Sequence, residues 1–180
     1  MDEKVMEQSQ QQCESIYYAA CADDIVAARV IGRGTHVNSP ALQELADHFF
    51  EKNTATRFII DLAECPAMDS TFMGTLAGIT LRQRNYHSGL TIILHANAQN
   101  RRLLDVLGLS KVLDFRDDGG ECSTDIPFTE QAQPEMSRVD RTLHMISAHE
   151  RLLNLDTNNE VKFQGVLESL RESLERERRK

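Results

Sequence analysis

The chain has 180 residues, of which 41% are apolar and 27% charged, an ordinary balance for a soluble globular protein. This length fits one domain with an appendage, and the apolar content excludes a wholly disordered chain and a disulfide-stapled miniprotein. No stretch approaches the about 18 consecutive apolar residues that a membrane span needs. The first residues also lack the basic and then apolar layout of a signal peptide. We therefore expect a cytoplasmic protein without a membrane span.

The charge balance argues against nucleic-acid binding. The chain carries 20 basic and 28 acidic residues, a net charge of −8. Its one dense basic patch, residues 176–180, is interleaved with an acid at the end of the chain. A duplex would be repelled overall, so we expect no nucleic-acid partner.

The first elements predict a β-hairpin and a helix. Residues 1–14 are polar, and we assign this N-terminal segment no function. Two apolar runs, 15–22 and 25–31, flank a pair of aspartates and indicate two antiparallel strands. Asn-Ser-Pro at 38–40 is a helix start signal, and apolar residues repeat at helical spacing to about residue 52.

The next segment alternates strands and helices. A branched apolar run at 57–62 and a second at 90–94 are typical of strands buried on both faces. Helical periodicity predicts helices at about 70–86 and 98–106, and Val112 to Phe115 forms a last short strand. This alternation indicates an α/β domain, residues 15–118, with a largely parallel core sheet.

The last third of the chain has a different character. Residues 119–137 carry two prolines and scattered polar groups, which predicts a linker. Residues 138–180 predict a helical hairpin with helices at about 140–153 and from 157 onward. The second helix has one apolar stripe, formed by Phe163, Val166, Leu167, Leu170 and Leu174. This stripe either packs on the α/β domain or mediates self-association or partner binding, and the sequence leaves these alternatives open.

The junction before the predicted helix at 70–86 carries the most distinctive chemistry. Asp69, Ser70 and Thr71 lie where a buried strand and loop give way to a helix. Free backbone N–H groups and the helix dipole favour negative charge there. A phosphate on Ser70 would add about −1.5 to −2 charges and could reverse the affinity of a docked partner. The alternative is that Asp69 or Ser70 merely caps the helix, which is the commoner role.

These residues also carry a family resemblance. Residues 58–115 resemble a STAS domain, the fold of bacterial anti-sigma factor antagonists. The resemblance rests on Ile-Ile-Asp-Leu at 59–62, Met-Asp-Ser-Thr at 68–71, the leucine-rich stretch 103–109 and Gly32. It covers about residues 15–118 and implies an α/β fold, a STAS-like mixed sheet with helices packed on it, followed here by a C-terminal two-helix extension.

The resemblance implies a partner-switching signalling protein that regulates bacterial transcription. The unphosphorylated form would bind an anti-sigma factor with a histidine-kinase-like ATPase fold, which phosphorylates Ser70 (second choice Thr71), and a PP2C-type phosphatase would reverse the reaction. The partner-binding residues would be Asp69, Ser70, Thr71, Phe72 and Met73. The family usually has glycine where this chain has Phe72, whose ring either faces the partner or packs inward. A homodimer through the C-terminal helices is a further expectation.

Two other readings stay open. One is an adaptor subunit of an ABC transporter or another multiprotein complex, in which the STAS hydroxyl contacts a partner without phosphorylation. The other is an enzyme or ligand-binding protein, but the chain has no phosphate-binding glycine motif and no catalytic set of acid, base and nucleophile. We therefore expect no catalytic residue and no cofactor.

Other residues with metal-binding or positioning chemistry give weaker signals. The four cysteines lack metal-ligand spacing. His144 and His149 are five residues apart and do not share a helix face, so we expect no metal site. His95 follows a predicted strand, where it is more often a loop residue than a ligand. Asp61 either orients the Ser70 loop or has a structural role.

Overall fold

The structure is a computed structural model that describes residues 14–21, 25–52, 57–86, 89–117 and 127–179. The strands are β1 (Ser15–Cys21), β2 (Ile25–Ile31), β3 (Arg57–Asp61), β4 (Thr91–Leu94), β5 (Leu113–Arg116) and β6 (Thr129–Gln131). The helices are α1 (Ser39–Glu51), α2 (Ser70–Tyr86), α3 (Ala98–Val106), the short 3-10 helix η1 (Leu109–Lys111), α4 (Arg138–Leu155) and α5 (Asn159–Arg178).

The described strands form one mixed sheet in the order β5-β4-β3-β2-β1-β6. Strands β2 to β5 are parallel neighbours, and β1 pairs antiparallel with both β2 and β6. The α/β class and the STAS-like mixed sheet expected from the sequence are confirmed. Strand β6 was not predicted: it lies in the segment interpreted as a linker, of which residues 119–126 are outside the described part. Most of the predicted N-terminal segment, residues 1–13, is also outside it.

Alternation along the strands divides the sheet into two faces. Val26, Ala28 and Ile60 belong to the main core, together with apolar residues of α1, α2 and α3. Their neighbours Ala27 and Ile59 point the other way and form a smaller cluster with other strand residues and Phe128. The main core therefore fixes the three helices against one face of the sheet.

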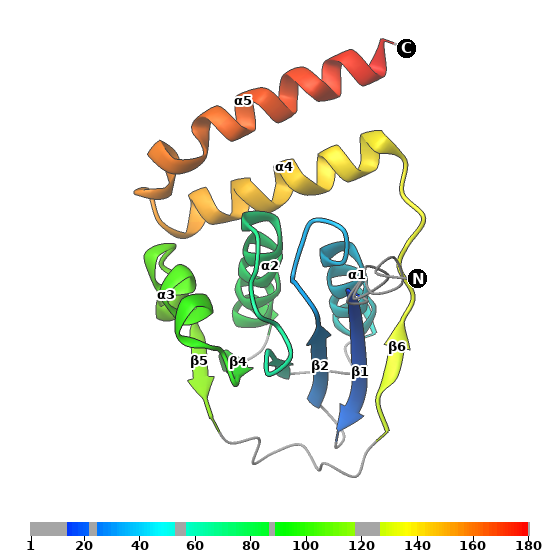
Figure 1. Cartoon of the computed structure of the whole chain (residues 1–180), viewed down its shortest axis with the longest axis vertical. Coiled ribbons are helices and arrows are strands. Elements are labelled where there is room, and N and C mark those ends of the chain that lie inside the picture. Colours follow the sequence, from blue (N-terminus) through cyan, green and yellow to red (C-terminus); the bar gives the residue numbers. More distant parts are fainter. Residues whose placement is uncertain (1–13, 22–24, 53–56, 87–88, 118–126, 180) are drawn as a thin grey trace, which may run out of the picture.

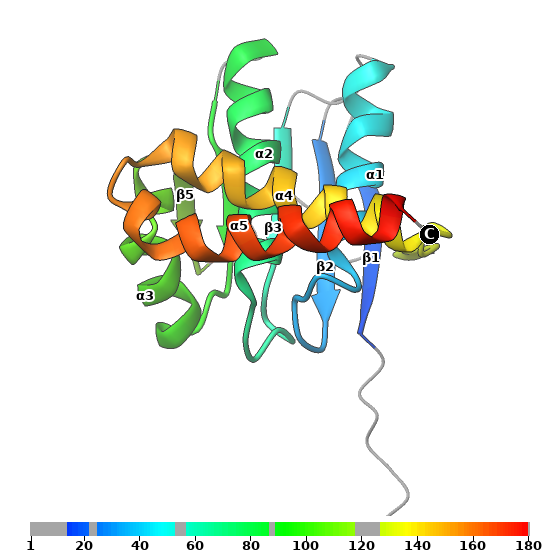
Figure 2. The same ribbon diagram turned by 90° about the horizontal axis from the view of Figure 1, so that it is seen from above.

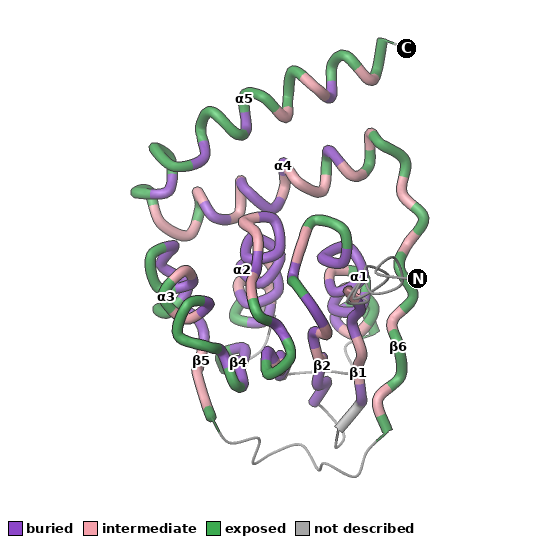
Figure 3. The backbone as a smooth tube through the Cα atoms, viewed as in Figure 1, coloured by how far each residue is buried: buried purple, intermediate pink, exposed green. Residues whose placement is uncertain are grey.

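The C-terminal hairpin covers the domain. Helix α4 crosses the ends of α1 and α2, and α5 lies outside α4 (Figures 1 and 2). In the predicted stripe of α5, Phe163, Leu167 and Leu174 are buried, whereas Val166 is exposed. Helix α2 is buried over most of its length, while α5 has a long exposed face (Figure 3). Intramolecular packing, one of the alternatives above, thus accounts for most of this stripe. Across the described part of the chain, none of the helices is long and apolar enough to cross a membrane.

Candidate functional site

Two loops meet at the candidate site, one after β2 and one after β3. Gly34 donates its N–H to the carbonyl of Ala67 at 3.0 Å and accepts from the N–H of Asp69 at 2.8 Å. Gly32 has a φ of 76°, a backbone conformation that suits glycine, and donates to the carbonyl of Glu64 at 3.0 Å. These bonds continue the parallel pairing beyond the strand ends and hold the first turn of α2 against the loop that leads into α1.

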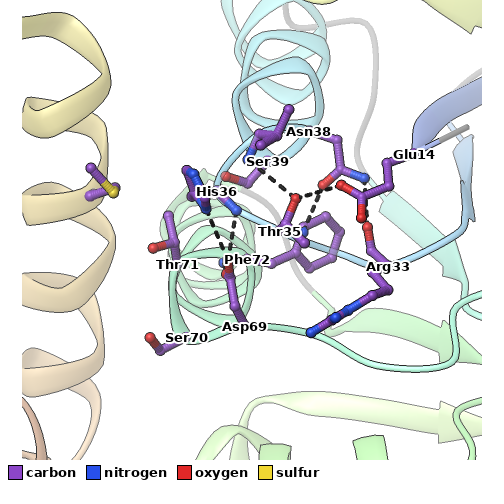
Figure 4. Close-up of polar contacts among 12 residues, drawn as sticks. Glu14, Arg33, Thr35, His36, Asn38, Ser39, Asp69, Ser70, Thr71 and Phe72 are labelled. Carbon is purple, nitrogen blue, oxygen red and sulfur yellow. Dashed lines mark hydrogen bonds and ion pairs between the residues drawn. The ribbon is translucent and has the colours of Figure 1, made fainter. Parts of the chain in front are cut away.

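Asp69 caps α2 and ties the two loops together (Figure 4). Its Oδ1 accepts from the backbone N–H of Phe72 at 2.8 Å, and its Oδ2 accepts from the N–H of His36 at 2.8 Å. The imidazole Nδ1 of His36 lies 3.5 Å from Oδ2. The capping role considered in the sequence analysis is therefore correct for Asp69. It places Ser70 at the start of the helix.

Ser70 contacts the C-terminal hairpin. Its Oγ lies 2.9 Å from Nε2 of His149 on α4, and Nδ1 of the same ring lies 2.7 Å from the carbonyl oxygen of Met145. Because a carbonyl oxygen only accepts, Nδ1 carries a proton, and in the neutral ring Nε2 then accepts the hydroxyl proton of Ser70. Figure 4 shows the hydroxyls of Ser70 and Thr71 directed toward the ribbon of α4.

A second serine–histidine contact lies nearby. Ser39 Oγ, at the start of α1, shares a hydrogen bond of 2.9 Å with Nε2 of His144 on α4. The two histidines, considered above only as metal ligands, instead contact the first residues of α1 and α2. No cluster of metal-ligating side chains occurs among the residues that the structure describes.

His144 makes the stability of the fold depend on pH. Burial lowers its pKa from 6.5 to about 4, the charges of Arg151 and Arg141 act in the same direction, and the charge of Asp69 opposes them. The unfolded imidazole keeps its ordinary pKa, so between these values the unfolded chain binds more protons and stability falls as the pH falls. We expect this residue to remove about 2 kcal/mol of unfolding free energy between pH 7 and pH 5.

Urea denaturation of the wild type and of His144→Gln at both pH values checks this prediction. The amide keeps a hydrogen-bonding group toward Ser39 but does not titrate, so carboxylates and other groups contribute equally to both proteins. The variant should lose less stability on acidification. An identical loss in both proteins would show that His144 is not the responsible group.

The close approach of α4 depends on two glycines of α2. A Cβ on Gly74 would lie 2.9 Å from the Cβ of Ala148 and closer still to its backbone carbonyl. A Cβ on Gly78 would lie 2.6 Å from the guanidinium of Arg151, which donates to Gln43 of α1. Each glycine costs a helix about 1 kcal/mol relative to alanine. Their spacing of four residues is a sequence signal for this contact, but a search for apolar periodicity does not detect it.

The predicted partner-binding residues differ in accessibility. Asp69 and Ser70 are partly exposed. Thr71 is 4% exposed, Met73 is 5% exposed, and the ring of Phe72 is completely buried against Gly34. Of the two orientations considered for Phe72, the structure has the inward one.

Other residues considered above have structural roles. Asp61 accepts from the backbone of Ala63, pairs with His95 Nδ1 at 2.9 Å and lies 3.4 Å from Nε of Arg29, so of its two readings the structural one holds. Cys65 is a buried free cysteine, and burial raises the pKa of its thiol.

Comparison with known proteins defines the class. The STAS domain family matches residues 19–122, more than half of the chain, and the chain therefore belongs to this family. The unphosphorylated form of the anti-sigma factor antagonist SpoIIAA has a TM-score of 0.52 at 17% identity, covering 59% of this chain and 92% of its own. The phosphorylated form of SpoIIAA from Bacillus has a TM-score of 0.51 at 17% identity, covering 59% and 95%. A candidate anti-sigma factor antagonist of Thermotoga maritima has a TM-score of 0.52 at 17% identity, covering 58% and 87%. No curated protein matches the chain significantly. These similarities establish the fold.

Proposed function

We propose that this chain is an anti-sigma factor antagonist that works by partner switching. The observation that carries the proposal is the position of Ser70 in a STAS fold, directly after the capping Asp69 and at the start of α2. The unphosphorylated chain would bind an anti-sigma factor with a histidine-kinase-like ATPase fold in the bacterial cytoplasm and so free a sigma factor for transcription.

The same position supports control by phosphorylation. A phosphate on Ser70 would place about −1.5 to −2 charges beside the carboxylate of Asp69 at the edge of the partner surface. The added negative charge would repel an acidic partner, while the helix N-terminus lowers the cost of the modification itself. A PP2C-type phosphatase would restore the binding form. The chain would be a substrate and ligand, with no catalytic role of its own.

Intact-mass spectrometry after incubation with Mg-ATP and an extract of the producing cells tests this function. We expect a gain of one phosphate in the wild type and none in Ser70→Ala, with partner capture by the unphosphorylated protein. Thr71→Ala serves as the matched control and should still gain the phosphate. A phosphate that persists in Ser70→Ala would show that another residue is the phosphorylation site.

A constitutive adaptor is the second candidate. It is favoured by the contact between Ser70 and His149, which engages the hydroxyl without any phosphate. Partner capture without phosphorylation in the experiment above would select this candidate. Self-association through the C-terminal helices would have to use the outer face of α5, where Val161 and Val166 are exposed.

A further inference from the structure

The surface around Ser70 is occupied by the chain's own C-terminal hairpin. The hydroxyl of Ser70 is bonded to His149, and the neighbouring Thr71 is almost completely buried. One turn further along α2, Gly74 has no room even for a Cβ because the backbone of Ala148 lies against it. A second protein therefore cannot bind the face of α2 that α4 covers.

Phosphorylation has the same requirement. In phosphoryl transfer from ATP, the serine oxygen bonds to the γ-phosphorus, the bond to the β,γ-bridging oxygen breaks, ADP leaves, and the hydroxyl proton passes to a base of the kinase. The phosphoryl group must reach the oxygen in line. In the structure Nε2 of His149 lies 2.9 Å from Ser70 Oγ and occupies the space on that side of the oxygen. Phosphoryl transfer along this line requires α4 to move.

The hairpin is held together by its own contacts. A separate apolar cluster joins α4 to α5 without any residue of the α/β domain, and its buried members are Ile146, Leu167 and Leu174. At the turn between the helices, Asn159 donates to the carbonyl of Leu107, and Lys111 pairs with Asp156 at 3.1 Å. The two helices thus form one unit, whose turn is attached beside α3 and whose Leu152 and Phe163 join the main core.

Away from the turn, α4 meets the domain mostly through polar contacts, whereas near the turn Leu152 is completely buried in the main core. The polar contacts are the hydrogen bonds of Ser39 with His144, of Ser70 with His149 and of Gln43 with Arg151, beside the two glycines of α2. Each of these groups can bond to water when α4 leaves, so separation exposes less apolar surface here than at the cluster between α4 and α5. The part of α4 that carries His144 and His149 is therefore the part that separates from the domain at the lowest cost, with Leu152 as the anchor near the turn.

We propose that the α4–α5 hairpin is a displaceable cover on Ser70, which a partner must lift before it can bind or phosphorylate this site. The identity of that partner rests on the proposed function, whereas the cover rests on the contacts of this chain alone. The hairpin then competes with the partner for the surface around Ser70 and sets how readily the partner can bind or phosphorylate this site.

Position-specific alkylation tests the cover without any partner. Ser70→Cys introduces a thiol at the covered position in the full-length chain, and iodoacetamide followed by peptide mapping gives its rate of modification. Ala148→Glu is added to force α4 off Gly74. Gly165→Glu is the matched control, since it introduces the same charge on α5, where a side chain has open space. The buried thiol of Cys65 reports any global unfolding in the same sample.

We expect Ala148→Glu to raise the alkylation rate at position 70 by about 10- to 1,000-fold, the range for a closed protein whose open state is 0.1–10% populated. Gly165→Glu should leave that rate unchanged, and Cys65 should stay protected in both. Equal rates at position 70 with and without Ala148→Glu would overturn the cover. If Cys65 also becomes reactive, Gly74→Ala replaces Ala148→Glu, because its Cβ would collide with the backbone of Ala148 while alanine is the best helix former, and the rates at positions 70 and 65 are compared in the same way.

The native serine then separates the cover from the proposed function. With Mg-ATP and the cell extract, the same substitutions on the Ser70 protein should speed phosphate incorporation for Ala148→Glu and not for Gly165→Glu. If the thiol at position 70 becomes exposed but no variant gains phosphate, the hairpin cover is supported and phosphorylation of Ser70 is contradicted. If all variants are phosphorylated equally and the thiol at position 70 is unprotected in each, the cover is contradicted and the phosphorylation switch is supported.

Discussion

Replacing Phe72 with alanine is expected to lower the free energy of unfolding by about 3–5 kcal/mol, the usual cost of emptying a fully buried aromatic site. The ring is 0% exposed and belongs to the main core. It also lies directly against Gly34, where a Cβ would come within 2.8 Å of the ring carbons. Urea denaturation measures the loss, with Phe49→Ala, at a partly exposed position of α1, as a less costly control.

A double-mutant cycle tests the fit between Phe72 and Gly34. Gly34→Ala should cost about 1–3 kcal/mol in the wild type, because the new methyl group collides with the ring. In the Phe72→Ala background the same change should cost at least about 1 kcal/mol less. Additive effects would mean that the ring does not fill this space. A small effect of Phe72→Ala alone would favour the partner-facing orientation instead.

The packing of Phe72 explains its role at the position where the family usually has glycine. Substituting the family's glycine for Phe72 would restore the motif but empty the core next to Gly34. The aromatic ring therefore belongs to the way this chain joins its two site loops. In the proposed function, recognition of a partner would fall to the neighbouring Asp69 and Ser70, which keep some exposure.

Much of the fold was predictable because its elements have strong local signals. Buried parallel strands are continuous branched runs, and the helix predicted at 70–86 has the bounds of α2. Strand β6 has three residues, of which two are exposed, so it carries neither an apolar run nor a regular alternation. Its place beside β1 comes from the tertiary pairing of Tyr17 and its neighbours, which no local pattern records.

The candidate site was predictable only in part, for a similar reason. The Asp69-Ser70 pair was predictable from its position before a helix. The side chains that contact it were not, because α4 meets α2 with Ala148 and His149, a small and a polar residue that apolar periodicity does not mark. Leu143, an apolar residue of the same helix, is 39% exposed. A helix that packs through glycines and polar groups hides its contact face from a search for apolar periodicity.

Asn159→Asp should also be strongly destabilising, by about 3 kcal/mol. Asn159 is 0% exposed at the start of α5, and its Nδ2 donates to the carbonyls of Leu107 and Leu152 at 3.0 and 2.9 Å. The aspartate has no donor for these carbonyls and brings a buried negative charge toward them. Lys162, whose Nζ lies 3.0 Å from Oδ1, offsets part of this cost.

Urea denaturation of Asn159→Asp and of the exposed neighbour Asn158→Asp separates this effect from the added charge. The control should cost no more than about 1 kcal/mol, since it gives up the 2.9 Å bond from Asn158 to the Asp156 carboxylate, while a carboxylate is favourable before a helix. The deficit of Asn159→Asp should shrink as the pH falls toward the pKa of the new carboxyl, because the protonated acid regains one donor. A variant as stable as the control at neutral pH would show that Leu107 and Leu152 find other donors and that the hairpin turn is not anchored through Asn159.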